Sequence, residues 1–166
     1  MKLARTGIIA AAILSVASIA FAQAPDFSGS WTVDAAAMPA PPAGAGGGGR
    51  GGGRGMAGPI VVTQTKDALT IERTMGANKV TQTYKLDGTE SVNKVTRGRG
   101  ENAMEVETKS TAKWDGAKLV ITTQSPGQGG EMMSSTQTWY LEGGTLVVEQ
   151  PGREGAVRKT VYKKTT

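Results

Sequence analysis

The side chains that most often perform catalysis are missing from this sequence, which contains neither histidine nor cysteine. Their absence excludes a Ser-His-Asp triad, a thiol nucleophile and the common zinc and copper sites. The remaining chemistry is that of carboxylates, lysines, arginines, amides and aromatic rings, and these residues form no catalytic constellation in the sequence. We therefore expect a protein that is not an enzyme, with no metal site and no cofactor.

Amides and aromatic rings recur at matched spacing in two stretches of the chain, TQTYKLDGTE (81–90) and TQTWYLEGGTL (136–146). In each stretch a glutamine precedes an aromatic residue by two positions, so the two share one face of a strand. The aromatic residues suit either a core or a stacking surface for a ligand. A glutamine or arginine that points inward needs a partner, which could be another side chain, water or a ligand. The candidate ligand-binding residues are Arg73, Gln82, Tyr84, Gln137, Trp139 and Gln150.

The elements around these residues are expected to be short strands. From Ile60 onward the sequence is rich in Val, Thr, Tyr and Trp with short alternation, and it shows no helical period. A further strand is expected near Trp31. The other strand candidates are 60–65, 69–74, 79–86, 89–96, 105–114, 117–124, 131–141, 145–150 and 155–163.

Tight turns and longer connections alternate strictly between these candidates, and the tight ones include Asp87-Gly88 and Asp115-Gly116. In an up-and-down meander, alternate connections lie at opposite ends of the sheet. We therefore expect an all-β antiparallel meander that closes into a barrel of about 8–10 strands. Apolar residues near the tight turns predict an apolar, closed base at that end of the barrel. The longer loops predict that the other end is open and has a basic rim. The rim residues are Lys79, Arg97, Arg99 and Arg153.

The beginning of the chain reads as an export signal. Lys2 and Arg5 precede an apolar run, and Ala20-Phe21-Ala22 suits signal peptidase. We expect residues 1–22 to be a signal peptide cleaved near Ala22-Gln23, which would place a non-lipidated protein in the periplasm or outside the cell. A first strand region (23–34), a Pro/Gly-rich flexible loop (35–59) and the meander (60–166) would follow as one domain.

One short motif, Gly29-Ser30-Trp31, resembles the G-x-W of the first strand in the calycin group, which comprises the lipocalins and their fatty-acid-binding relatives. The stretch DFSGSW (26–31), followed by repeated L-[DE]-G hairpins, is also similar to many uncharacterised exported bacterial proteins with lipocalin-like domains. The resemblance implies that Gly29 and Trp31 close the base of the barrel beside a basic residue near the C-terminus. Arg158 is the best-placed candidate for that residue, with Lys159 and Arg153 as alternatives.

Two functions fit these expectations. In the first, the barrel binds a small amphiphilic or anionic ligand with its apolar end down. In the second, a solid barrel serves as an envelope interaction module, and its basic rim and Gly-rich arm bind an anionic polymer or a protein. For either function we expect a monomer that binds no nucleic acid and does not span the membrane after signal cleavage.

Overall fold

The computed structural model describes residues 24–37, 58–75, 78–97, 104–127, 129–152 and 156–165. The expected signal peptide, most of the Gly-rich loop, Arg99 and Arg153 therefore lie outside the described residues. No helix in the described ranges is long and apolar enough to cross a membrane. The strands are β1 (Gly29–Val33), β2 (Ile60–Gln64), β3 (Ala68–Met75), β4 (Asn78–Lys85), β5 (Ser91–Arg97), β6 (Met104–Asp115), β7 (Lys118–Pro126), β8 (Met132–Glu142), β9 (Thr145–Pro151) and β10 (Val157–Thr165).

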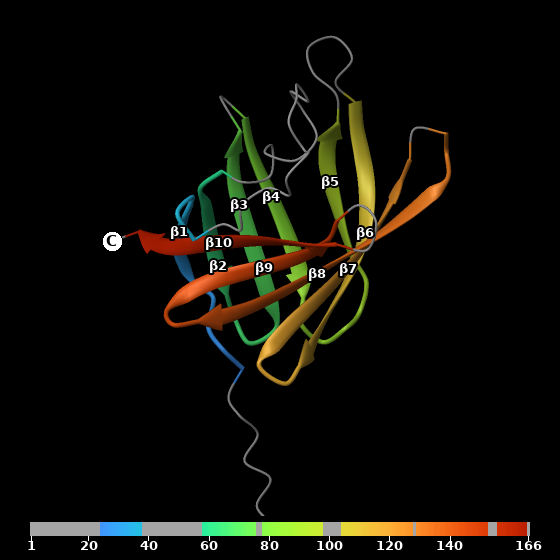
Figure 1. Ribbon diagram of the computed structural model, residues 1–166. Coiled ribbons are helices and arrows are strands. Elements are labelled where there is room, and N and C mark those ends of the chain that lie inside the picture. The colour runs from blue at the N-terminus through green and yellow to red at the C-terminus, as the bar shows by residue number, and fades with distance from the viewer. Residues whose placement is uncertain are drawn as a thin grey trace, which may run out of the picture.

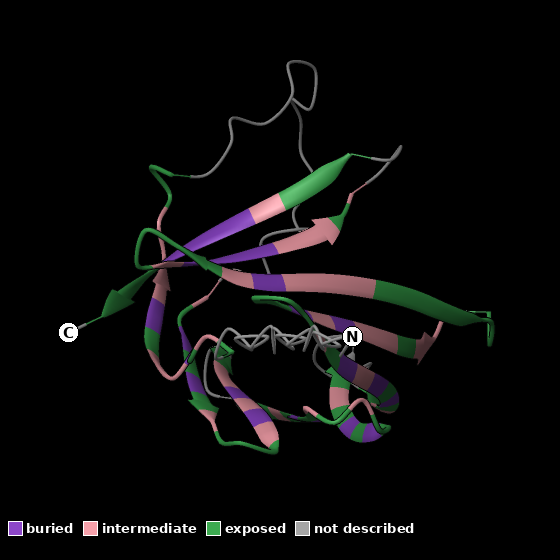
Figure 2. Ribbon diagram, turned by 90° about the horizontal axis from the view of Figure 1, so that it is seen from below, coloured by how far each residue is buried: buried purple, intermediate pink, exposed green. Residues whose placement is uncertain are grey.

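These ten strands form one antiparallel sheet that curls into a nearly closed barrel (Figure 1). Consecutive strands pair along the meander except β4 and β5, and β1 pairs antiparallel with β10, so that Trp31 lies opposite Lys164. Period-2 alternation is visible as buried and exposed bands along the strands (Figure 2). The structure confirms the all-β meander expected from the sequence, and the strand bounds agree within a few residues.

The seam between β4 and β5 corrects one expectation. The tight turn at Asp87-Gly88 was expected to join two paired strands of the meander, yet β4 and β5 are the two ends of the sheet order and share no backbone ladder. Side chains of β5 form hydrogen bonds to the backbone of β4 instead. Asn93 accepts a hydrogen bond from Thr83 N (2.8 Å) and donates one to Thr83 O (3.0 Å), while Ser91 Oγ accepts one from Lys85 N (2.8 Å).

Replacing Asn93 by alanine should therefore loosen this seam. The backbone groups of Thr83 would lose both partners, which costs about 1–2 kcal/mol of unfolding free energy for partly buried groups. Hydrogen exchange should accelerate at the Thr83 amide, while the amide of Thr70, in the β2–β3–β4 ladder, should change less. Asn93→Asp is the matched variant, because it keeps an acceptor for Thr83 N and loses the donor to Thr83 O. Unchanged exchange at Thr83 in Asn93→Ala would show that the side chain does not hold the seam.

The base of the barrel is closed by Phe27, which precedes β1. Its side chain is fully buried, and its ring centroid lies 5.7 Å from that of Trp114 and 6.2 Å from that of Trp139. The indole of Trp31 donates a hydrogen bond to Phe27 O (2.9 Å). Four aromatic residues from distant parts of the chain therefore meet at the base.

Gln64, at the end of β2, forms hydrogen bonds with the segment that contains Phe27. Its side-chain oxygen accepts a hydrogen bond from Phe27 N (3.0 Å), and its side-chain nitrogen donates to Pro25 O (3.0 Å). Its own backbone N–H donates to Ser28 Oγ (3.0 Å). Because these bonds pair the backbone of a segment without a ladder, Gln64 replaces a strand partner there.

The basic residue beside Trp31 is Lys164 rather than Arg158. Lys164 Nζ lies 5.6 Å from the centroid of the Trp31 ring, within the range of a cation–π contact. Arg158 lies opposite Gln150 on β9, several residues away along β10. Gly29 leaves room for the lysine, since a Cβ at that position would lie 2.6 Å from Lys164 Cε. In this barrel the basic residue that contacts the tryptophan of the G-x-W motif is therefore Lys164, which the sequence pattern did not indicate.

Candidate ligand-binding site

The exposure of the inward-facing residues rises from the tight-turn end of the barrel to the loop end. On β8, Trp139 is fully buried, Gln137 is half-buried and Met133 is 61% exposed. On β6, Ala112 is fully buried and Met104 is 64% exposed. The interior is therefore closed at the base and open to solvent toward the loops, as the expected cup requires.

Side chains fill the base of this cup. The core cluster there combines Phe27, Trp31 and Trp139 with buried aliphatic residues, and Trp114 packs against the cluster. The aliphatic residues include Leu69, Ile71, Leu119, Ile121 and Leu146, each at most 1% exposed. Side chains that are fully buried border no space large enough to hold a water molecule. The accessible part of the interior consequently begins above this layer.

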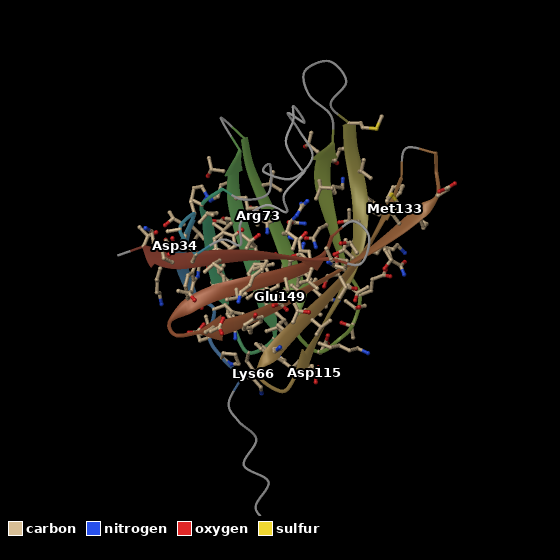
Figure 3. All side chains as sticks on the ribbon, in the orientation of Figure 1. Asp34, Lys66, Arg73, Asp115, Met133 and Glu149 are labelled. Atoms are coloured by element: carbon tan, nitrogen blue, oxygen red, sulfur yellow. The ribbon has the colours of Figure 1, made fainter. Side chains whose placement is uncertain are left out.

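A polar belt lies directly above the base, and we define it as the inward residues Arg73, Gln82, Thr123, Ser135, Gln137 and Gln150. All except the more exposed Ser135 are half-buried. Within the belt, Arg73 Nη1 donates to Gln82 Oε1 (3.3 Å), and Gln137 Oε1 accepts from the indole of Trp139 (3.1 Å). Thr123 shares a 2.9 Å hydrogen bond with Ser110. Four of the six residues proposed from the sequence, Arg73, Gln82, Gln137 and Gln150, thus lie in the belt, and Arg73 is labelled on β3 in Figure 3.

The other two proposed residues, Tyr84 and Trp139, belong to the core layer. Tyr84 is 6% exposed and Trp139 is fully buried, so both form the floor beneath the belt rather than an open stacking surface. The registers place Tyr84 opposite Leu69 and Trp139 opposite Leu119. Of the two interpretations left open by the sequence, their burial favours the core.

Arg73 acts electrostatically on two buried tyrosines, Tyr84 and Tyr162. Burial raises the pKa of each phenol above its ordinary value, and the positive charge of Arg73 opposes that rise. Tyr162 lies on β10, opposite Leu146. One cation therefore faces two phenols at the boundary between floor and belt.

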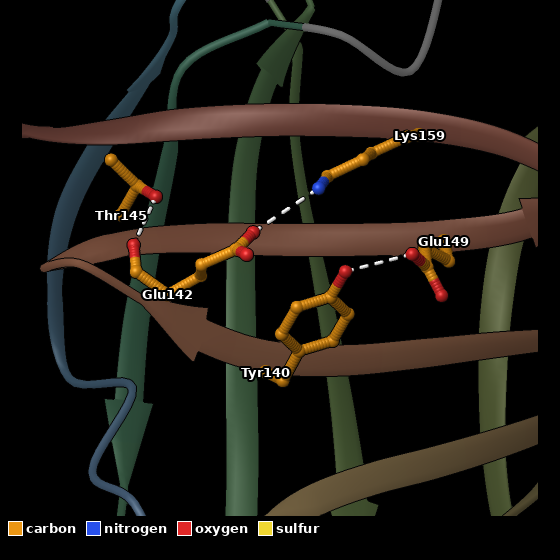
Figure 4. A network of polar contacts seen from close by, with 5 residues as sticks. All are labelled: Tyr140, Glu142, Thr145, Glu149 and Lys159. Atoms are coloured by element: carbon orange, nitrogen blue, oxygen red, sulfur yellow. Dashed lines mark hydrogen bonds and ion pairs between the residues drawn. The ribbon is translucent and has the colours of Figure 1, made fainter. Parts of the chain in front are cut away.

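Burial also raises the pKa of the third tyrosine, Tyr140, together with the hydrogen bond from its hydroxyl to Glu149 Oε1 (2.7 Å) (Figure 4). This tyrosine lies on the outer face of the barrel. There Lys118 Nζ lies 4.7 Å from the ring centroid, and Lys159 pairs with Glu142 at 3.1 Å. All three tyrosines of the chain are thus held in their neutral form.

A spectrophotometric titration should detect this effect. In the folded protein, phenolate absorbance should appear at higher pH than in the urea-unfolded chain, where tyrosine has a pKa of about 10. Because the fold favours the neutral phenol, this stabilisation is fully present below pH of about 10 and is lost as pH rises through the folded pKa values. The urea midpoint of unfolding should fall over that range. Coincident titrations of the folded and unfolded chains would contradict the prediction.

The carboxylates of the described strands all lie on the outer face of the sheet, which also carries lysines such as Lys79 and Lys159. Arg73 and Arg158 occupy inward register positions, while every strand carboxylate occupies an outward one. This assignment follows from strand alternation, since each carboxylate lies one position from an inward residue on its own strand. The carboxylates are Glu72, Glu105, Glu107, Asp115, Glu142 and Glu149. The described interior is therefore cationic and favours anions.

The expected basic rim is described only in part. Lys79 lies on the outer face and pairs with Glu72 at 2.8 Å, so it does not line the interior. Arg97 lies at the end of β5, and nothing is described of its side chain.

An open depression of about 400 Å³ adjoins Lys79 on the outside of β1, β2 and β3. Its lining includes Thr32, Val61, Glu72 and Thr74. This hollow lies on the opposite side of the barrel wall from Arg73, and its charged lining residues are already paired with each other.

Sequence reasoning missed Phe27, Gln64, Tyr162 and the inward hydroxyls. Phe27 had a detectable signal, because it is a lone aromatic residue four positions before Trp31. The hydroxyls also followed the strand period, for example Ser110 and Thr108 on β6, but Ser and Thr are equally common on outer faces. Gln64 and Tyr162 depend on contacts with distant segments and had no local signal.

Solved structures resemble this barrel, including two that match over most of both chains. A fluorescent protein, the UnaG N57A mutant, matches with a TM-score of 0.55 and 19% identity, covering 84% of this chain and 96% of that chain. Human cRBP IV matches with a TM-score of 0.54 and 20% identity, covering 85% and 99%. The chain has a calycin-like fold. No protein-family model and no curated protein sequence matches this calycin-like barrel, and at these identities the likeness concerns the fold alone.

Proposed function

We propose that this protein is an exported, non-enzymatic binding protein that holds one small anionic or amphiphilic molecule in the polar belt. The observation that carries the proposal is the position of Arg73. This arginine lies inside an interior that is open to solvent, while the strand carboxylates lie outside. An anion that enters from the loop end would meet Arg73 and the glutamines above a closed floor.

Native mass spectrometry of protein purified without denaturation from its own source tests the proposal. We expect a bound species with the wild-type chain and with Lys79→Gln, which removes a cation from the outer face. Arg73→Gln should lose that species while retaining the circular dichroism spectrum of the wild-type chain. Arg73→Lys keeps the charge and should retain part of the binding.

Two results would count against this function. One is a wild-type chain with no retained species. The other is binding that depends on Lys79 and not on Arg73, which would favour the surface interaction module instead. Export is tested separately, by N-terminal sequencing of the mature protein, where cleavage near Ala22-Gln23 is expected.

A further inference from the structure

We propose that the bound molecule is a compact polyhydroxy carboxylate, of the chemical class of the sugar acids, and not a long-chain fatty acid. This inference rests on the proposed function and assigns the ligand class of the same site. Three features of the interior support it: the packing of the base, the chemistry of the belt and the sign of the inward charges.

The packed base leaves no path for an alkyl tail. Phe27, Leu69, Trp139 and Leu146 are fully buried beneath the belt. A chain directed downward would have to displace side chains that already pack against one another, and overpacking or rearranging such a core is destabilising. The ligand must therefore fit within the belt and the mouth above it.

The belt itself suits hydroxyl groups. Gln82, Gln137 and Gln150 present amides from three strands, and Thr123 and Ser135 add hydroxyls opposite each other on β7 and β8. An alkyl chain against this wall would separate these groups from water without offering a hydrogen bond, and each group left unsatisfied would weaken binding. A polyhydroxy ligand replaces the lost water contacts.

Apolar groups also form part of the inner wall, and half-buried Val80 on β4 lies opposite Arg73. Val95 and Val106 face each other in register on β5 and β6, and both are half-buried. They offer a limited apolar surface on the side of the barrel near the seam. This division, with polar groups on most sides and a small apolar area on one, matches the C–H and O–H faces of a sugar ring better than it matches a chain of methylenes.

The positive charge of the inward arginines favours a ligand that carries a carboxylate over a neutral sugar. Arg73 and Arg158 are positive, and none of the carboxylates in the described strands faces inward. A guanidinium presents paired N–H donors that match a carboxylate. Because the Arg73 charge also opposes the pKa rise of Tyr84 and Tyr162, a bound carboxylate should raise both phenol pKa values further.

Isothermal titration with three probes tests the inference: sodium glucuronate, glucose and palmitate. We expect glucuronate to bind the wild-type chain more tightly than glucose or palmitate. Arg73→Gln should weaken glucuronate binding by about tenfold or more, because a hydrogen bond to a charged group is lost. Gln150→Leu, nearly isosteric, should weaken it by a smaller factor, and Lys79→Gln should leave it unchanged. Circular dichroism confirms that each variant is folded.

The outcomes separate this inference from the proposed function. Tighter binding of palmitate than of glucuronate, with loss in Arg73→Gln, would overturn the ligand class and leave the binding function intact. Equal binding of glucose and glucuronate would overturn the selection for an acid. If glucuronate does not bind, the species found by native mass spectrometry decides: a polyhydroxy acid supports the inference, and any other molecule refutes it. If no probe binds and no species is retained, both proposals fail.

Discussion

Replacing Phe27 with alanine is expected to lower the free energy of unfolding by about 3–5 kcal/mol, the range for removing a large buried aromatic side chain. The ring is fully buried against Trp114 and Trp139, so its removal leaves a cavity at the base and breaks two aromatic contacts. Urea unfolding followed by tryptophan fluorescence measures the loss. The same experiment should show a shifted native emission spectrum, because two of the affected residues are tryptophans.

A matched control is Leu141→Ala. Leu141 occupies the same place in stretch 136–146 as Leu86 does in stretch 81–90, yet Leu141 is 37% exposed while Leu86 packs against the core. We therefore expect less than about 1 kcal/mol of destabilisation from Leu141→Ala. Equal losses in the two variants would show that Phe27 does not plug the base.

Gly29→Ala is expected to destabilise the protein by about 2–4 kcal/mol. Gly29 has a φ of +140°, which side chains with a Cβ rarely adopt, and such strain costs about 1–3 kcal/mol. The new Cβ would also displace Lys164 from the Trp31 ring, at a further cost of about 0.5–1 kcal/mol. Chemical denaturation gives the total effect.

Two variants separate these contributions. Gly116→Ala introduces a Cβ at a φ of +59° into open space, so it reports backbone strain without a clash. It should cost about 1–2 kcal/mol, less than Gly29→Ala. In a Lys164→Ala background the clash disappears, and Gly29→Ala should cost less than in the wild-type chain. Additive effects of the Gly29 and Lys164 substitutions would refute the steric account.

The strands and their order follow from local features of the sequence. Alternation of Val, Thr and aromatic residues sets the strands, and pairs such as Asp115-Gly116 set the reversals, as the positive φ of Gly116 shows. These signals act between residues that are neighbours in the chain. They also indicate which residues share one face of a strand, and the structure places that face of Arg73, Gln82, Gln137 and Gln150 inward.

The tertiary structure alone decided how the barrel closes. The stretches 81–90 and 136–146 have similar sequences but different outcomes. The second forms a backbone ladder between β8 and β9, whereas at the first β4 and β5 are joined by side chains, because Asn93 and Ser91 take the place of backbone partners. Lys164 rather than Arg158 covers Trp31, since the β1–β10 register joins residues that lie more than a hundred positions apart. Alternation has the same form in any register, so it cannot specify which distant residues meet. Those distant contacts fill the base, place the floor under Arg73 and determine the space that remains for a ligand.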